Sequence, residues 1–189
     1  VSGAMYYEMT DLLVRGPLPM PFTRRYDSQS TFDGPMGFGW QHPFLVRLES
    51  GGSGQKVFVD RQARRVYFGL RSDGAYEENR LDHLVLSQPG TPPFRVTDKF
   101  QMKWDFDAGG KLTKVTDRNG NTITLGYSGS NLTAITDTFG RALALTYDGA
   151  NRIQMVSGGG RTATYTFNST THNLTRVDSS DGTFVTYEY

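Results

Sequence analysis

Residues 120–127 read Gly-Asn-Thr-Ile-Thr-Leu-Gly-Tyr: a glycine, then alternating side chains, then an aromatic ring. A glycine followed seven residues later by an aromatic recurs at intervals of 20, 20 and 22 residues in the second half of the 189-residue chain. The glycines are Gly120, Gly140, Gly160 and Gly182, and the aromatics are Tyr127, Tyr147, Phe167 and Tyr189. A unit of about twenty residues is too short to bury its own hydrophobic face, so the pattern predicts an array of stacked repeats.

Each unit alternates apolar and polar residues after its glycine. In the first unit Ile123, Leu125 and Tyr127 would share one face of a strand, with threonines on the other. This period of two indicates half-buried β-strands. The same alternation in residues 102–106 adds Phe106 to the series of repeat aromatics. We expect the aromatics and Trp40 to pack in a core.

Turn-forming residues interrupt the pattern twice in each unit. One turn follows the aromatic, as at residues 148–151, and the other surrounds the glycine, as at Asn119-Gly120, because Asn-Gly tolerates positive φ angles. Each unit is therefore expected to be one β-hairpin. The aliphatic pair Leu112 and Val115, three residues apart, would face opposite ways in a regular strand. Either a β-bulge or burial of both faces would reconcile that spacing.

These patterns predict an all-β protein in which serial hairpins form a curved, twisted antiparallel sheet. Residues 1–95 lack the twenty-residue period, so we expect a β-rich N-terminal region there, followed by a repeat array at 96–189, with one continuous sheet through both. The 22 glycines, the 8 prolines and an aromatic content of 13% suit this turn-rich class.

Charge and composition exclude several functions. The net charge of +1 provides no global field for nucleic acid, and no apolar run is long enough for a membrane-spanning helix. The chain has no cysteine, which excludes disulfides and thiolate metal sites. A signal-peptide pattern is also missing from its start.

Residues that could carry chemistry are scattered. His42, His83 and His172 lack any metal-ligand spacing, and no catalytic triad or nucleotide-binding loop is recognisable, so we expect no enzyme, metal or cofactor. Carboxylates recur near one turn of successive units, and local hydrogen bonding to the backbone explains them better than a bound ion does. These carboxylates belong to Asp98, Asp117, Asp137 and Asp178.

The N-terminal half carries a more specific signal. Residues 16–19 read Gly-Pro-Leu-Pro, residues 23–26 read Thr-Arg-Arg-Tyr, and residues 34–40 read Gly-Pro-Met-Gly-Phe-Gly-Trp. Together with the opening Val1-Ser2-Gly3 and the repeats, they resemble the start of Rhs (YD-repeat) proteins over essentially the whole chain. The residues that carry this N-terminal motif are Gly16, Pro17, Arg25, Tyr26, Gly37, Gly39 and Trp40. Tyr147-Asp148 is the one literal Tyr-Asp pair of the repeats.

The resemblance implies a structural role. Members of this family wind YD repeats into a shell that, in bacterial polymorphic toxins used in interbacterial competition, holds a C-terminal toxin domain until delivery. This chain would be a non-catalytic N-terminal part of such a shell, secreted or delivered at the cell surface. Its partners would be the rest of the shell, the toxin cargo, a secretion apparatus and other copies paired through strand edges.

Two alternatives belong to other classes. A cell-surface or carbohydrate-binding module would need exposed Tyr or Trp rings beside Asp or Asn partners. A hydrolase would need two carboxylates converging in a cleft, and the sequence provides no such pair. We favour the shell module over both.

Overall fold

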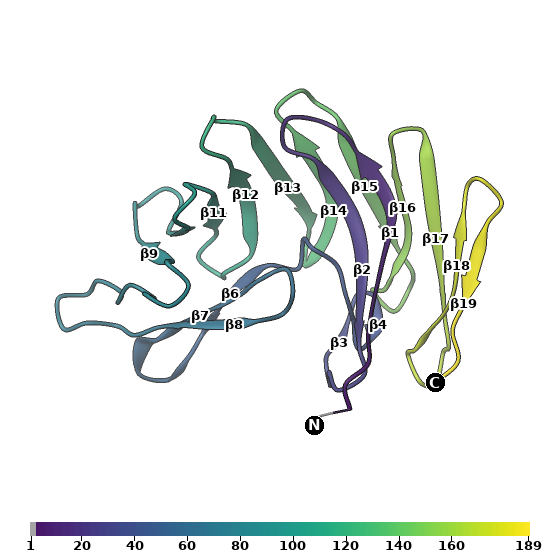
Figure 1. The fold of residues 1–189 in the computed structure, drawn as a ribbon, viewed down its shortest axis with the longest axis horizontal. Helices are drawn as coiled ribbons and strands as arrows, with labels where there is room; N and C mark the ends of the chain where they lie inside the picture. The colour runs from purple at the N-terminus through teal and green to yellow at the C-terminus, as the bar shows by residue number, and fades with distance from the viewer. Residues whose placement is uncertain (1–2) are drawn as a thin grey trace. The chain divides into compact units, whose positions relative to one another are not determined.

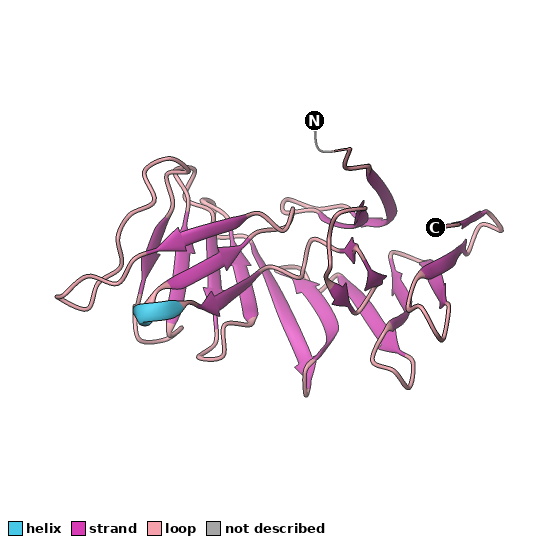
Figure 2. Ribbon diagram, turned by 90° about the horizontal axis from the view of Figure 1, so that it is seen from below, coloured by secondary structure: helices cyan, strands magenta, loops and turns pink. Residues whose placement is uncertain are grey.

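Consecutive hairpins make up most of the molecule, as a computed structural model that describes residues 3–189 shows (Figures 1 and 2). Val1 and Ser2, which open the sequence resemblance, lie outside the described residues. The chain divides into two compact units, one of residues 1–43 with 126–189 and one of residues 44–125. The predicted division at residue 95 stays a prediction.

The first unit combines the N-terminal segment with the later repeats. Its strands are β1 (Tyr6–Val14), β2 (Met20–Asp27), β3 (Asp33–Gly34), β4 (Gly37–Phe38), β5 (Trp40–Gln41), β14 (Asn131–Asp137), β15 (Ala142–Tyr147), β16 (Ile153–Gly158), β17 (Arg161–Phe167), β18 (Leu174–Ser179) and β19 (Phe184–Thr186). Strands β1, β2 and β5 form a separate three-stranded sheet, and β1 packs against β16 and β17. Figure 1 shows this purple hairpin beside the green repeat strands.

The second unit pairs a small sheet with the first repeats. Its strands are β6 (Arg47–Ser50), β7 (Lys56–Val59), β8 (Arg65–Phe68), β9 (Val85–Ser87), β10 (Phe94–Thr97), β11 (Lys103–Phe106) and β12 (Leu112–Thr116), and β13 (Thr122–Ser128) contains the boundary between the units. A 3₁₀ turn, η1 (Gly52–Gly54), is the cyan segment of Figure 2. The ring of Phe58 in β7 lies 5.7 Å from that of Trp104 and 6.1 Å from that of Phe106.

The all-β prediction with serial hairpins is confirmed. Strands β9 to β19 follow one another in sequence order in an antiparallel sheet of eleven strands. The alternation along each strand places the apolar residues on the buried side, so Leu143 and Leu145 are buried while Ala144 and Thr146 are exposed. Apolar burial of this kind is the main favourable contribution to folding such a sheet.

A β-bulge accounts for the aliphatic pairs three residues apart. Across β15 and β16 the register changes so that Thr146 opposes Met155 but Tyr147 opposes Ile153, which leaves Gln154 as the extra residue. The same shift occurs between β11 and β12 and between β17 and β18. A bulge reverses the alternation, so Ile153 and Val156 are both fully buried.

Most hairpin turns share one hydrogen-bonding pattern built on an aspartate. At the turn of β14 and β15 the carboxylate of Asp137 accepts the backbone N–H groups of Phe139 and Arg141 at 2.9 Å each. The backbone N–H of Gly140 donates to the Asp137 carbonyl at 3.1 Å, and Gly140 has a φ of 78°. A left-handed residue at this place is why glycine recurs there.

The structural interpretation of the recurring carboxylates is confirmed for Asp98 and Asp117 as well, because each accepts two backbone N–H groups of its own turn. For Asp178 the expected hydrogen bond to the backbone of the turn is wrong, although its role is structural as well. Its carboxylate pairs with Arg176, and Asp181 accepts the backbone N–H of Thr183 in the last turn instead. Ser179 takes the place that Asp137 has in its own turn, because its N–H donates to the Thr183 carbonyl and its carbonyl accepts the N–H of Gly182.

Candidate functional site

A buried ion pair lies between the N-terminal hairpin and the last repeats of the first unit. The Nε of Arg24, in β2, donates to Oδ2 of Asp11, in β1, at 2.7 Å, and their side chains are 1% and 3% exposed. Arg24 follows Met20 and Phe22 on the inward face of β2, where alternation places it among apolar residues. Asp11 is the extra residue of a bulge between Thr10 and Leu12, which turns its side chain inward.

Two tyrosines of the repeats complete the hydrogen bonds of this pair. The hydroxyl of Tyr165, in β17, donates to the same Asp11 oxygen at 2.7 Å, and a guanidinium N–H of Arg24 donates to the hydroxyl of Tyr187. Burial, reinforced by the charge of Asp11, raises the pKa of Tyr165 well above its ordinary value. Burial also raises the pKa of Tyr187 to about 12. Both hydroxyls therefore stay protonated and can donate at neutral pH.

Aromatic rings surround the ion pair. The Trp40 ring lies 4.9 Å from that of Tyr187, and the Arg24 guanidinium lies 5.4 Å from the centroids of both rings. The Nε1–H of Trp40 donates to the Tyr189 hydroxyl at 2.7 Å, and that hydroxyl donates to the Leu174 carbonyl at 2.8 Å. Such rings shield the charges from water and add cation–π attraction.

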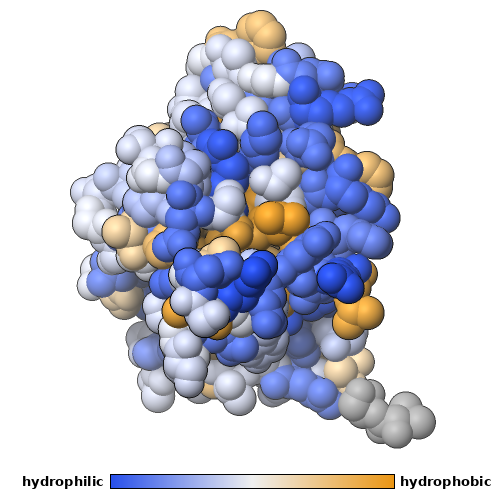
Figure 3. Space-filling model, turned by 90° about the vertical axis from the view of Figure 1, so that its left-hand side faces the viewer, coloured by the Kyte–Doolittle hydropathy of each residue, from blue (hydrophilic) through white to orange (hydrophobic). Residues whose placement is uncertain are grey.

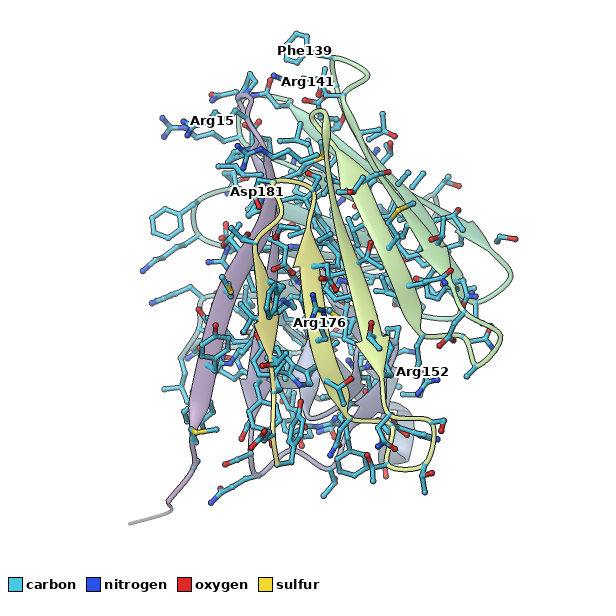
Figure 4. All side chains as sticks on the ribbon, turned by 90° about the vertical axis from the view of Figure 1, so that its right-hand side faces the viewer. Arg15, Phe139, Arg141, Arg152, Arg176 and Asp181 are labelled. Carbon is cyan, nitrogen blue, oxygen red and sulfur yellow. The ribbon has the colours of Figure 1, made fainter. Side chains whose placement is uncertain are left out.

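A second contact holds the far end of the same hairpin. An N–H of Arg141 donates to the carbonyl of Arg15 at 2.5 Å, and Arg141 also pairs with Asp137 (Figure 4). A Cβ at Gly16 would overlap the Arg141 guanidinium, so Arg141 could not keep its position against any larger residue. Gly16 of the N-terminal motif therefore permits the close approach of the Arg141 guanidinium.

A third contact lies at the β3–β4 turn. The carboxylate of Asp33 lies 2.7 Å from Nδ1 of His172, and the backbone N–H of Phe38 donates to the His172 carbonyl at 3.3 Å. Gly37 has a φ of 82°, and a Cβ there would overlap that carbonyl. Gly37 is required for both its backbone conformation and its contact.

The other residues of the N-terminal motif pack around Trp40. The Tyr26 ring lies 5.1 Å from that of Trp40, and a Cβ at Gly39 would lie 2.8 Å from the Tyr26 ring. Arg25 pairs with Glu8 at 3.5 Å on the exposed face of the hairpin. Pro17 is exposed in the turn between β1 and β2.

The repeat aromatics differ in burial. Phe106 is fully buried, and Tyr127, Tyr147 and Phe167 are half-buried at the ends of their strands. Tyr147 donates its hydroxyl to the Leu132 carbonyl at 2.9 Å, as Tyr189 does to Leu174. Tyr189 is 57% exposed, so the expectation of burial is wrong for this ring.

The repeat glycines provide the backbone conformations that the hairpin turns require. Gly120, Gly140 and Gly182 occupy the left-handed place of aspartate- or serine-initiated turns with φ of 86°, 78° and 86°. Gly160 differs, because it and Gly159 both have positive φ between paired residues Gly158 and Arg161, which makes a two-residue turn of the primed type.

No group of three or more His, Cys, Asp or Glu residues with metal-binding geometry occurs in residues 3–189. His42 is fully buried, stacks on Phe22 at 5.1 Å between ring centroids, and has its pKa lowered to about 3 by burial. On the face shown in Figure 3, hydrophobic residues are interspersed among hydrophilic ones. Within residues 3–189, no helix of membrane-spanning length and apolarity occurs.

The sequence analysis missed Asp11, Arg24, Tyr165 and Tyr187. One signal was present, because Arg24 continues the alternation of Met20 and Phe22 and so interrupts an apolar face with a charge. Tyr165 lies 154 positions from Asp11, and no local pattern connects residues that far apart.

Comparison with known proteins agrees with this arrangement. Residues 1–68 match a family described as a domain of unknown function (DUF6531), and residues 128–162 match the RHS repeat. Together the two matches support an Rhs (YD-repeat) family protein. The matched RHS repeat contains β14, β15 and β16, and thus two complete aspartate turns, at Asp137 and Asp148, and one bulge.

A curated relative is a toxin. Over 97 residues the chain is 27% identical to the double-stranded DNA deaminase toxin A of Burkholderia cenocepacia (strain H111). That match covers 51% of this chain and 7% of the toxin. The chain therefore corresponds to a small part of that relative's length.

Proposed function

We propose that this chain is a toxin-associated structural module, a wall segment of an Rhs-type shell that encloses a C-terminal toxin domain and assists its delivery. The recurring bulge is the observation that carries the proposal. It occurs at three of the repeat aromatics, Phe106, Tyr147 and Phe167. A bulge bends its strand and increases the twist, so bulges repeated at equivalent places add curvature along the array.

The chemistry of the described side chains supports a non-catalytic wall. The buried ion pair and the turn aspartates form their hydrogen bonds with other residues of the same chain. The toxin name of the relative supports a toxin context, and the remainder of the shell, its cargo and a secretion apparatus are the partners proposed, in a secreted or surface-delivered protein.

The test is sequencing of the native product by mass spectrometry, combined with limited proteolysis. Further YD repeats followed by an unrelated domain that resists protease until the protein is unfolded in urea would support encapsulation. A native product that ends near Tyr189 would overturn it, since hairpins this few cannot enclose a domain.

Glycan binding is the second candidate, and exposed tyrosines on the first unit favour it. Tyr6 and Tyr189 are each 57% exposed and Tyr7 is 37% exposed. Exposed rings can stack on sugars. Binding to a glycan array that Tyr6→Ala and Tyr7→Ala abolish, and that Tyr67→Ala on the second unit leaves unchanged, would support this function over a wall without ligands.

A further inference from the structure

The repeats of the array are alike in backbone but differ at one inward position. Two residues before each repeat aromatic stand Trp104, Leu125, Leu145, Tyr165 and Tyr187. A hydroxyl at this position therefore occurs only in the last two units. Those two hydroxyls are the ones that meet the buried pair of the N-terminal hairpin, Tyr165 at Asp11 and Tyr187 at Arg24.

Apolar packing of the hairpin does not by itself select these repeats. Its apolar residues Leu12, Met20 and Phe22 contribute non-directional burial, which aliphatic neighbours in any unit can supply. Moving by one unit crosses two strands, a distance of about 10 Å along the sheet. Such a shift would bring Asp11 to Leu145, and a buried carboxylate would lose one of its two side-chain donors.

We propose that the Asp11–Arg24 pair selects the docking register of the N-terminal hairpin by matching its charges to Tyr165 and Tyr187. A buried ion pair is seldom more stabilising than apolar residues of the same size, and its best-attested use is to fix registry. An unsatisfied buried polar group is costly, so the wrong register is penalised more strongly than the correct one is rewarded. The inference does not rest on a shell or a cargo.

The contact at the β3–β4 turn can report which repeats the N-terminal hairpin docks against. Asp33 meets His172, which has a φ of 60° in the turn after Phe167. Asn151 occupies the equivalent place one unit earlier, in the turn after Tyr147, also with a φ of 60°. The chain has no cysteine, so paired cysteines at 33 and 172, or at 33 and 151, can be joined by a short bismaleimide without background.

The deciding variant moves the tyrosine pair one unit toward the N-terminus. Leu145→Tyr with Tyr187→Phe offers hydroxyls at 145 and 165 instead of 165 and 187. The matched control, Leu145→Phe with Tyr187→Phe, has the same rings without the new hydroxyl. In the first variant we expect the yield of the 33–151 crosslink to be at least about fivefold above that of the control. This ratio corresponds to the low end of the cost of an unsatisfied buried polar group. A 33–172 crosslink at the unsubstituted yield in both variants, without the 33–151 product, would overturn the proposal.

A single substitution tests the proposal if those variants fail to fold. Tyr165→Phe preserves the ring and removes one donor to Asp11. Hydrogen exchange of the β1 and β2 amides should accelerate about tenfold, while the turn amides of Phe139 and Arg141 exchange at an unchanged rate. Unchanged exchange in β1 and β2 would show that the hydroxyl does not hold the hairpin and would likewise overturn the proposal.

Discussion

Replacing Arg24 by methionine isolates the energetic role of the buried pair. The change keeps the length and much of the volume of the side chain but leaves the Asp11 carboxylate, 3% exposed, with only the Tyr165 hydroxyl as a side-chain donor among the bonds described above. Removing one partner of a buried ion pair costs about 3–5 kcal/mol, because the remaining charge cannot return to water. For a urea m-value of about 2 kcal/mol/M, the unfolding midpoint should fall by about 2 M.

The assay needs a probe that reports on the first unit alone. Trp40 lies in that unit and Trp104 in the other, so a Trp104→Phe background leaves Trp40 fluorescence as the signal. The control is Arg24→Met combined with Asp11→Leu, which removes both charges. Apolar residues of similar volume often replace a buried pair without loss, so the double variant should recover to within about 1–2 kcal/mol of the parent.

Two results would refute this reasoning. A loss below about 1 kcal/mol in Arg24→Met would mean that the pair behaves like a solvated surface salt bridge. A double variant as unstable as the single one would mean that packing of the Arg24 stem against Trp40, rather than an unpaired charge, dominates the cost.

The remaining predictions concern an acid-sensitive core residue, a turn and a repeat aromatic. Burial lowers the pKa of His42 to about 3, so between pH 6.5 and 3 the unfolded state binds one proton more than the folded state. As the pH is lowered through this range, the free energy of unfolding should decrease by about 1.4 kcal/mol per pH unit more than in His42→Phe. Urea midpoints that change in parallel with pH in the two proteins would contradict this. Gly140→Ala should destabilise by about 1–2 kcal/mol in thermal unfolding because its φ is 78°, whereas Gly149→Ala, in open space without positive φ, should stay within about 0.5 kcal/mol. Tyr147→Phe should lower the free energy of unfolding by about 1 kcal/mol, because it removes the hydrogen bond to the Leu132 carbonyl. Tyr147→Ala should lower it by about 3 kcal/mol, because it also removes the ring. Equal losses in urea titrations would show that the half-buried ring contributes nothing.

The sequence by itself determined the repeat unit and its fold class. Alternation in residues such as Leu143 and Leu145 specifies a strand with one buried face, because successive side chains point to opposite sides. Asp137 and Gly140 specify the turn, because the carboxylate and the left-handed residue act within five positions of the chain. The bulge was foreseen as one of two alternatives from the spacing of Leu112 and Val115. These features are local, so a local pattern reveals them.

Tertiary structure alone decided what meets the N-terminal hairpin. The contacts of Asp11 with Tyr165 and of Trp40 with Tyr189 connect residues about 150 positions apart. Burial makes these charges and hydroxyls interact strongly, and burial is a property of the packed molecule. The same is true of His42, whose lowered pKa comes from exclusion of water and not from any neighbour in the sequence. A repeat pattern describes every unit alike, so the place where the hairpin docks depends on the few positions at which the units differ.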